Sequence, residues 1–569
     1  MRGTNALLLI ASLVGITTGL GAIGFTALIR YFNRLFFGMT DRFLSQSLGA
    51  GGFHYWTAVI PAIGGLIVGP IVFLYAREAR GHGVPEVMNA VARLGGVIRP
   101  RVALAKAVAS AACIGSGGSA GREGPIVQIG SALGSTVGQF LGFSGERIKI
   151  LVGCGAAAGI SAVFNAPIAG VLFSLEVILG DFAIGTFSPV LVSSVLASVL
   201  TRSILGNHPA FAVPGYELAS AWEVLFYAVM SVGLGLVAVL FTKTLDVMED
   251  GFERLRIPNV LKPVLGGLLL GLLALMYPQL LADGYESVRL ALHNYLALGI
   301  LVPLVFLKIV ATSLTLGSGS SGGIFAPSLF MGAMAGGAFG YLAHAVFPEV
   351  TANPGAYALV GMAGVIAAAT HAPITALVIV FEMTGDYHIV LPLMITVAIS
   401  TVVARSVSSE SIYTMKLVKR GIDIRGGRDL NILQRFHVAD VLDDHYTRFP
   451  SQAPLDNVLA VVEESHETHF VVEGSGGELR GLVSLHDMRG VLAKHDVGAA
   501  LVAEDVARHK IPELVPADDL QKALEAFNLT GHALLPVVRD GTSKIVVGVV
   551  RREALLNFYN LRLLEQLRR

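Results

Sequence analysis

The chain has 569 residues, of which 53% are hydrophobic and 14% are charged, and its formal net charge at neutral pH is zero. This composition is typical of a polytopic membrane protein and argues against a soluble enzyme. The lack of a basic excess also argues against nucleic acid as a partner. The two cysteines, Cys113 and Cys154, lie in apolar segments without CxxC spacing, so we expect buried thiols and no metal site.

Near its start the chain has an apolar stretch, 6–29, which is longer than a signal peptide and is expected to remain as a membrane helix. Further apolar segments follow up to about Val418, and many are shorter than the roughly 20 residues that a spanning helix needs. Broken helices at membrane depth are tolerated only inside protein or beside an aqueous path. The sequence therefore predicts an all-α polytopic membrane domain over residues 1–418.

Two glycine-rich runs, 115–125 and 317–327, each open an apolar helix and match each other at a shift of 202 residues. Glycine lets the backbone turn so that several N–H groups converge, and proline in a first helical turn costs no hydrogen bond. The unpaired N–H groups and the positive end of the helix dipole favour a small anion at such a place.

A second block repeats at a shift of 206 residues, pairing 166–168 with 372–374 and Glu176 with Glu382. Two ordered blocks with nearly the same shift indicate two halves, at about 1–205 and 220–415. Spacing alone does not give their relative topology. Short, interrupted helices at matching places in two halves point to a binding site in the middle of the membrane.

Basic residues gather between 77 and 106 and again between 416 and 428. By the positive-inside rule both segments face the cytoplasm, and with them both chain termini. Residues 419–435 are expected to be a linker. The tail at 436–569 shows a β-β-α pattern twice, with expected strands at 470–472, 481–484, 533–538 and 548–551, which predicts a tandem pair of α/β units.

The runs 121–125, 323–327 and 81–85 resemble the three signature motifs of the CLC chloride channel and transporter family, in matching order and context. The tail resembles a tandem pair of CBS domains. This resemblance implies the CLC fold, with two inverted repeats of broken helices. It also implies a homodimer inside the lipid bilayer of a cell membrane, with a separate path for chloride or another small anion in each subunit.

Glu123 matches the gating glutamate of that family. A carboxylate beside converging helix N-termini can occupy an anion site itself, and protonation would release it. The alternative is an ion pair with Arg122 that only holds the loop. Carboxylates inside a membrane are costly and usually functional, which favours the gate.

The resemblance also indicates which residues surround the anion. The backbone N–H groups of Ile324 and Phe325 would line the central site, and the ring of Phe325 would narrow the path. Tyr413 resembles the tyrosine that offers its hydroxyl to the anion and acts with Glu123 as a gate, although tyrosine is also common at membrane interfaces. The expected anion-site residues are His82, Gly83, Arg122, Glu123, Gly124, Ile324, Phe325 and Tyr413.

His82 departs from the serine that is usual at this place in the family. A neutral imidazole still donates one N–H, and an imidazolium would attract anions by its charge. The alternative is a side chain that points into the basic connection and binds nothing. The sequence therefore indicates anion transport more directly than selectivity for chloride.

Val177 stands where proton-coupled members of the family carry an internal glutamate, and valine cannot carry a proton. Glu176 lies one residue earlier, about 100° around the helix, and its repeat partner Glu382 suggests a structural role for both. We therefore expect a passive chloride channel, influenced by voltage or pH and gated by Glu123. The alternative is a proton-coupled anion antiporter with a different internal proton route.

Ser484 and Asp487 keep the Ser-x-x-Asp pattern with which, by resemblance, a CBS pair holds an adenine nucleotide. The second unit has Arg551 and Ala554 at these places, so a tail that only stabilises the dimer is the alternative. No cofactor is required. The glycine runs lack the Gly-Lys-Ser/Thr ending of a nucleotide-hydrolysing loop, and no catalytic nucleophile–base set is visible. Converging helix N-termini also argue against a CBS-bearing cation transporter.

Overall fold

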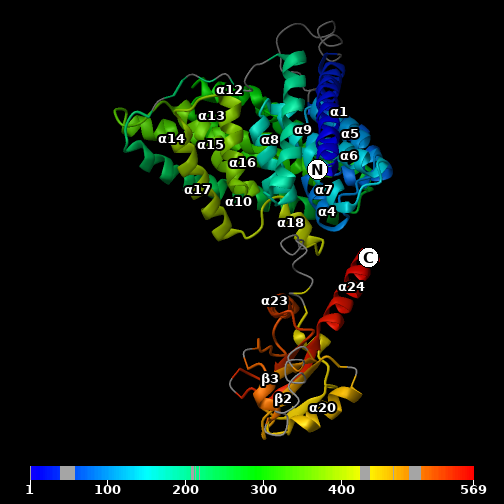
Figure 1. Ribbon diagram of the computed structural model, residues 1–569. Helices are drawn as coiled ribbons and strands as arrows, with labels where there is room; N and C mark the ends of the chain where they lie inside the picture. The colour runs from blue at the N-terminus through cyan, green and yellow to red at the C-terminus, as the bar shows by residue number, and fades with distance from the viewer. Residues whose placement is uncertain are drawn as a thin grey trace, which may run out of the picture. The chain divides into compact units, whose positions relative to one another are not determined.

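The computed structural model describes residues 2–38, 58–206, 211, 213, 215–216, 218–422, 433, 436–465, 467–485, 488, 501–509, 511–541 and 543–568. The chain divides into two compact units, Met1–Ile424 and Arg425–Arg569 (Figure 1). The predicted linker at 419–435 lies largely outside the described residues.

The first unit is helical throughout its described part, and eight of its helices are long and apolar enough to cross a membrane. This confirms the predicted polytopic all-α domain. Figure 1 shows α1, α5 and α6 on one side of the unit and α13 to α17 on the other. The helices of the first half are α1 (Arg2–Asn33), η1 (Arg34–Gly38), α3 (Ile60–Pro70), η3 (Ile71–Tyr75), η4 (Arg77–Ala79), α4 (Val84–Arg93), α5 (Arg101–Gly115), α6 (Glu123–Phe140), α7 (Gly145–Phe164), α8 (Pro167–Phe173), η5 (Ser174–Leu179) and α9 (Ile184–Leu205).

The second half begins with a helix of 32 residues and then repeats the order of long and short helices. Its helices are α10 (Glu223–Arg254), η6 (Asn259–Leu261), α11 (Lys262–Met276), η7 (Pro278–Leu280), α12 (Tyr285–Leu292), α13 (Leu298–Gly317), α14 (Phe325–Val346), α15 (Pro354–Thr370), α16 (Pro373–Thr384), α17 (Val390–Val407) and α18 (Thr414–Lys419). Proline stands in the first turn of both α8 and α16, where its missing N–H costs nothing.

The two halves are related by a twofold axis, and their equivalent helices α3 and α11 cross at close range. A Cβ added to Gly65 would collide with the Pro263 carbonyl, and one added to Gly267 would collide with the Pro61 carbonyl. Such reciprocal contacts are what a twofold axis requires. Pro61 lies opposite Gly267 and Gly65 lies opposite Pro263, so residue numbers rise along α3 while those of the facing residues fall along α11. The equivalent helices therefore run antiparallel. The halves are therefore inverted repeats, a point that the spacing of the sequence alone left open.

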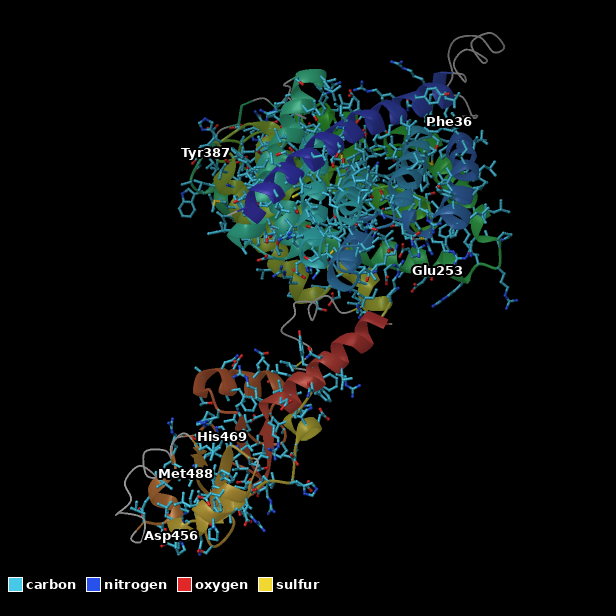
Figure 2. The ribbon with its side chains drawn as sticks, turned by 45° about the vertical axis from the view of Figure 1, so that its right-hand side comes forward. Phe36, Glu253, Tyr387, Asp456, His469 and Met488 are labelled. Carbon is cyan, nitrogen blue, oxygen red and sulfur yellow. The ribbon has the colours of Figure 1, made fainter. Side chains whose placement is uncertain are left out.

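The C-terminal unit contains two small sheets flanked by helices, and Asp456, His469 and Met488 mark its first part in Figure 2. Strand β1 pairs in parallel with β2, β2 pairs antiparallel with β3, and β4 pairs antiparallel with β5. Its elements are η8 (Val438–Val441), β1 (Arg448–Pro450), α20 (Leu455–Glu464), β2 (His469–Glu473), β3 (Leu479–Ser484), α22 (Ala503–Val506), α23 (Leu520–Thr530), β4 (Leu534–Val538), β5 (Val546–Arg551) and α24 (Arg552–Arg568).

The two hairpins of this unit share one register. Phe470 faces Val483 in the first hairpin and Leu535 faces Val550 in the second, and each hairpin has a β-bulge near the end of its first strand. Separate apolar cores lie under the two hairpins, one around Phe470 and one around Leu535. The predicted α/β character of the tail is confirmed.

Candidate anion site

The three glycine-containing loops meet at the centre of the membrane unit. The N–H of Gly121 donates to the carbonyl of Gly323 at 2.8 Å, and the N–H of Gly323 donates back to Gly121 at 2.6 Å. The N–H of Gly81 donates to the carbonyl of Ser320 at 3.0 Å, which brings the third loop to the same place. Loops that lie far apart in the sequence therefore surround one point.

Close approach explains why glycine occupies this meeting point. A Cβ on Gly124 would collide with the carbonyl oxygen of His82, and a Cβ on Gly323 would lie 2.8 Å from the Gly124 nitrogen. Gly83 has a φ of +85°, which L side chains rarely adopt. A side chain at any of these positions would push the loops apart.

Helices α6 and α14 both begin at this centre, with Glu123 and Phe325 at equivalent first positions. The N–H groups of a first helical turn have no partner within the helix, and the helix dipole is positive there. Ile324 and Phe325 are buried, and the Phe325 ring lies 5.6 Å from the ring of Phe164. Paired helix N-termini behind apolar rings form a place suited to a small anion.

Two buried lysines hold the loops that precede α4 and α12. Lys106 Nζ donates to the carbonyls of Ala79 at 3.1 Å and Gly81 at 2.6 Å. Lys308 Nζ donates to the carbonyls of Leu280 at 3.0 Å and Ala282 at 3.1 Å. The repeat therefore extends to these loops. His82 corresponds in position to Asp283, and Val84 corresponds to Tyr285.

Glu123 is buried, and its hydrogen-bond partner is a residue that the sequence analysis did not single out. Its Oε1 accepts a hydrogen bond of 2.5 Å from the hydroxyl of Tyr285, whereas Oε2 has no partner among the described residues. The guanidinium of Arg122 lies 5.3 Å from the centre of the Tyr285 ring. Arg122 and Glu123, both described, form no ion pair within 4.0 Å, so the structure does not support the alternative of a simple loop-holding pair.

A cavity of about 300 Å³ opens beside Arg122. Its charged lining residues are Arg30, Arg34, Arg122 and Asp283, so cations outnumber the single carboxylate. We call the edge of the unit that carries Phe36 the Phe36 face and the edge that carries Glu253 the Glu253 face; Figure 2 shows them on opposite edges. Arg34 begins the short helix that contains Phe36, so the cavity lies toward the Phe36 face. Clustered cations around a cavity attract small anions.

His82 and Tyr413 lie together on the other side of the loop junction. Both are buried, and their rings are 5.7 Å apart. The Nδ1 of His82 has no hydrogen-bond partner within the part of the chain that the structure describes. The Nζ of Lys416 lies near Gly81, and a Cβ placed on that glycine would be only 2.9 Å from this nitrogen. His82 therefore sits inside the protein beside Tyr413, and its contact with an anion stays a prediction.

Val177 is half-buried in η5 and packs against the apolar core. The neighbouring Glu176 caps the start of α16 by accepting the N–H groups of Ile374 at 3.2 Å and Thr375 at 2.7 Å. Glu382 caps the start of α8 in the same way, through Ile168 and Ala169. Both glutamates therefore have the structural role that their repeat relationship suggested.

In the tail, Ser484 ends β3, but Asp487 lies outside the described residues, so the proposed nucleotide contact stays a prediction. At the corresponding place in the second α/β repeat of the tail, Arg551 forms ion pairs with Asp443 at 3.0 Å and with Glu467 at 2.7 Å. Partial burial opposes ionisation of both carboxyls, but hydrogen bonds, those from Arg551 foremost, outweigh it and hold the pKa of Asp443 and of Glu467 below their usual values. Among the described residues, no group of three or more His, Cys, Asp and Glu side chains could hold a metal ion.

Comparison with known proteins gives the family. Residues 64–405 match the model of the voltage-gated chloride channel family, and residues 502–560 match that of the CBS domain. A putative chloride channel protein ClcB-like from Ralstonia nicotianae is 34% identical over 73% of this chain and 98% of the relative. The H(+)/Cl(-) exchange transporter ClcA of Vibrio campbellii is 33% identical over 72% of this chain and 89% of the relative.

A solved structure gives the same result. The X-ray crystal structure of a slow cyanobacterial Cl-/H+ antiporter is similar over 73% of this chain and 97% of that chain, with a TM-score of 0.66 and 25% identity. The chain therefore belongs to the voltage-gated chloride channel (CLC) family and carries a CBS domain in its C-terminal unit.

Proposed function

We propose that the protein is an antiporter that exchanges chloride, or a similar small anion, for protons, and that Glu123 couples the two movements. One observation carries this proposal. A buried carboxylate stands at the meeting point of two helix N-termini, with one oxygen held by Tyr285 and the other without a partner among the described residues.

The physical reason is competition for one place. Helix N-termini stabilise a negative charge, which either the carboxylate of Glu123 or a small anion can supply. Two negative charges that compete for the same buried place repel each other strongly. Protonation removes the charge of Glu123, so the carboxyl group leaves and the anion takes its place. Each exchange of carboxylate for anion therefore involves one proton.

Two of the similar proteins support coupling to protons over a passive channel. The Vibrio relative is named an H(+)/Cl(-) exchange transporter, and the similar crystal structure is that of a Cl-/H+ antiporter. The passive channel expected from Val177 thus has less support than the alternative. In an antiporter of this sequence, protons moving to Glu123 from the Glu253 face cannot use the side chain of residue 177.

A passive anion channel is the second candidate, because one observation favours it. Val177 leaves no carboxyl group at the position where proton-coupled members of the family have one. The Ralstonia relative is also named a putative chloride channel protein. Both candidates assign the same role to Glu123 as the group that opens and closes the anion path, so they differ only in whether protons must cross.

The reversal potential separates the two candidates. The full chain is reconstituted into liposomes under a fixed chloride gradient, and the voltage of zero current is measured with and without an opposing proton gradient. We expect the proton gradient to shift this voltage, and we expect Glu123→Gln to abolish the shift. A wild-type reversal potential that stays at the chloride equilibrium value would contradict antiport and establish the channel.

We further propose that the Glu253 face and the tail are cytoplasmic and that two copies form a dimer with one anion path each. The basic segments beside Arg80 support this orientation. Both native cysteines are buried, whereas the Glu253 side chain is 59% exposed. A membrane-impermeant thiol reagent should therefore label Glu253→Cys in spheroplasts only after the membrane is permeabilised. Labelling of intact spheroplasts would contradict the orientation.

A further inference from the structure

The position of Tyr285 is fixed by the loop in front of it. Lys308 Nζ donates hydrogen bonds to the carbonyls of Leu280 and Ala282, and Gly284 adopts a φ of +78°. A Cβ on Gly284 would lie 2.6 Å from the ring of Phe330, so only glycine lets the loop pack this closely. Tyr285 follows directly as the first residue of α12.

The ring of Tyr285 is held by two neighbours. The guanidinium of Arg122 lies 5.3 Å from the ring centre, within the range of a cation–π interaction. The ring of Phe211 lies 5.4 Å away in an edge-to-face arrangement at 66°. With its ring held in this way, Tyr285 directs its hydroxyl at Oε1 of Glu123.

Several charged or titratable groups face Glu123 from the elements around it. They are Arg122 on its own loop, Asp283 and Tyr285 at the start of α12, and Tyr413 before α18. Arg122 favours the ionised carboxylate by its charge and Asp283 opposes it. Among the described residues, the side chain that hydrogen-bonds the carboxylate is that of Tyr285.

The equivalent contact in the other half of the protein has no polar groups. The twofold axis relates Glu123 to Phe325 and Tyr285 to Val84, so the pair that would correspond to carboxylate and hydroxyl is apolar. The polar pair therefore exists only once, and its neighbours Arg122 and Asp283 line the cavity toward the Phe36 face. It is a feature of the gate and is not required by the repeat.

We propose that Tyr285 is a positioning residue that holds the ionised carboxylate of Glu123 in the anion site and thereby sets the pH at which transport begins. The inference rests on the proposed role of Glu123. A hydrogen bond from a hydroxyl to an ionised carboxylate stabilises the ionised form. To release the site, the carboxyl group must be protonated and must leave this hydroxyl.

Tyr285→Phe removes only the hydroxyl, so it is the sharpest test. Without the hydrogen bond, Glu123 is protonated more easily, and the pH of half-maximal anion efflux should rise by about 1 unit, the equivalent of one charge-assisted hydrogen bond. A monofluorinated tyrosine at position 285 keeps the side chain but donates more strongly. This substitution should move the pH of half-maximal efflux to a lower value. The expected shift comes from the stronger hydrogen bond and needs no change of packing.

The controls use the same proteoliposome efflux assay across a range of pH. Tyr341→Phe removes another half-buried hydroxyl, which donates to the Asn294 carbonyl at 3.1 Å, and should leave the midpoint unchanged. In a Glu123→Gln background, Tyr285→Phe should add no further change. A merely structural role of Tyr285 would alter protein yield or melting temperature without moving the midpoint in opposite directions for the two substitutions.

The outcomes separate the two proposals. If Glu123→Gln leaves the pH response intact, the proposed role of Glu123 fails. If Glu123→Gln removes the response but Tyr285→Phe and the fluorinated tyrosine leave the midpoint in place, only the inference about Tyr285 is overturned. A folded Tyr285→Phe protein without transport would also overturn it, because loss of the hold should make release easier.

Discussion

Glu176 and Glu382 each cap a helix in the opposite half of the membrane unit. Glu176 lies in the first half and accepts the N–H of Thr375 at 2.7 Å, and Glu382 lies in the second half and accepts the N–H of Ala169 at 2.7 Å. Each carboxylate thus caps the first turn of a helix in the other half that begins with a proline. The two halves are therefore joined by reciprocal charge-assisted hydrogen bonds.

This relationship predicts a loss of stability when either carboxylate is neutralised. Glu176→Gln and Glu382→Gln should each lower the free energy of unfolding by about 1–3 kcal/mol, because helix N–H groups lose a charged acceptor. Thermal denaturation of the purified protein in detergent measures the loss. The control is Glu146→Gln, which removes an exposed pair with Lys149 worth about 0.5 kcal/mol or less.

A different result would change the role of Glu176. If Glu176→Gln kept the wild-type stability but lost proton movement in the reversal-potential assay, Glu176 would itself carry protons in place of the glutamate that Val177 lacks. Glu382→Gln provides the comparison, since it removes the same kind of cap at the equivalent place.

His82 should contribute to anion affinity. It is buried beside Tyr413 with Nδ1 unpartnered among the described residues, and its ring can donate one N–H to an anion. His82→Ala should weaken chloride binding, measured by isothermal titration calorimetry, by about tenfold, the loss expected for one hydrogen bond to a charged group. The control is His293→Ala, which removes a half-buried histidine whose Nδ1 lies 2.9 Å from the carbonyl oxygen of Arg289. Unchanged affinity would mean that the imidazole does not touch the anion.

The tail should depend on Arg551 in a pH-dependent way. The pKa values of Asp443 and Glu467 are lowered in the folded tail by their hydrogen bonds with Arg551, despite partial burial. Their contribution to stability is therefore present above the unfolded pKa values, about 3.9 and 4.3, and is lost as the pH falls through the lower folded values. Arg551→Ala should cost at most about 1 kcal/mol near neutral pH, because the pairs are partly exposed.

Hydrogen exchange of β5 and residues 443–447 in the full chain measures this effect. The difference between wild type and Arg551→Ala should shrink once the pH falls below about 4. Lys522→Ala removes an exposed pair with Asp518 and should leave the exchange of β5 unchanged. A difference between wild type and Arg551→Ala that stayed constant down to low pH would mean that Arg551 acts by packing alone.

The sequence was sufficient to predict the features that depend on spacing. Glycine and proline at fixed places identified the converging loops, and the shifts of 202 and 206 residues identified the two halves. The sequence did not reveal Tyr285, because its hydrogen bond with Glu123 joins residues that are 162 positions apart. Extending the repeat from 81–83 to 282–284 would have placed Tyr285 at the start of α12, but its counterpart there is Val84, which gives no hint of a hydroxyl. Antiparallel packing of α3 and α11 likewise arises only from tertiary contact.

The most direct test of Glu123 is anion efflux from proteoliposomes as a function of pH, compared between the wild-type chain and Glu123→Gln. The wild-type protein should transport faster as the solution becomes more acidic, because protonation frees the paired helix N-termini for an anion. The variant, whose side chain cannot ionise, should transport at a rate that hardly changes with pH. If Glu123→Gln keeps the wild-type pH response, Glu123 is not the group that occupies the anion site.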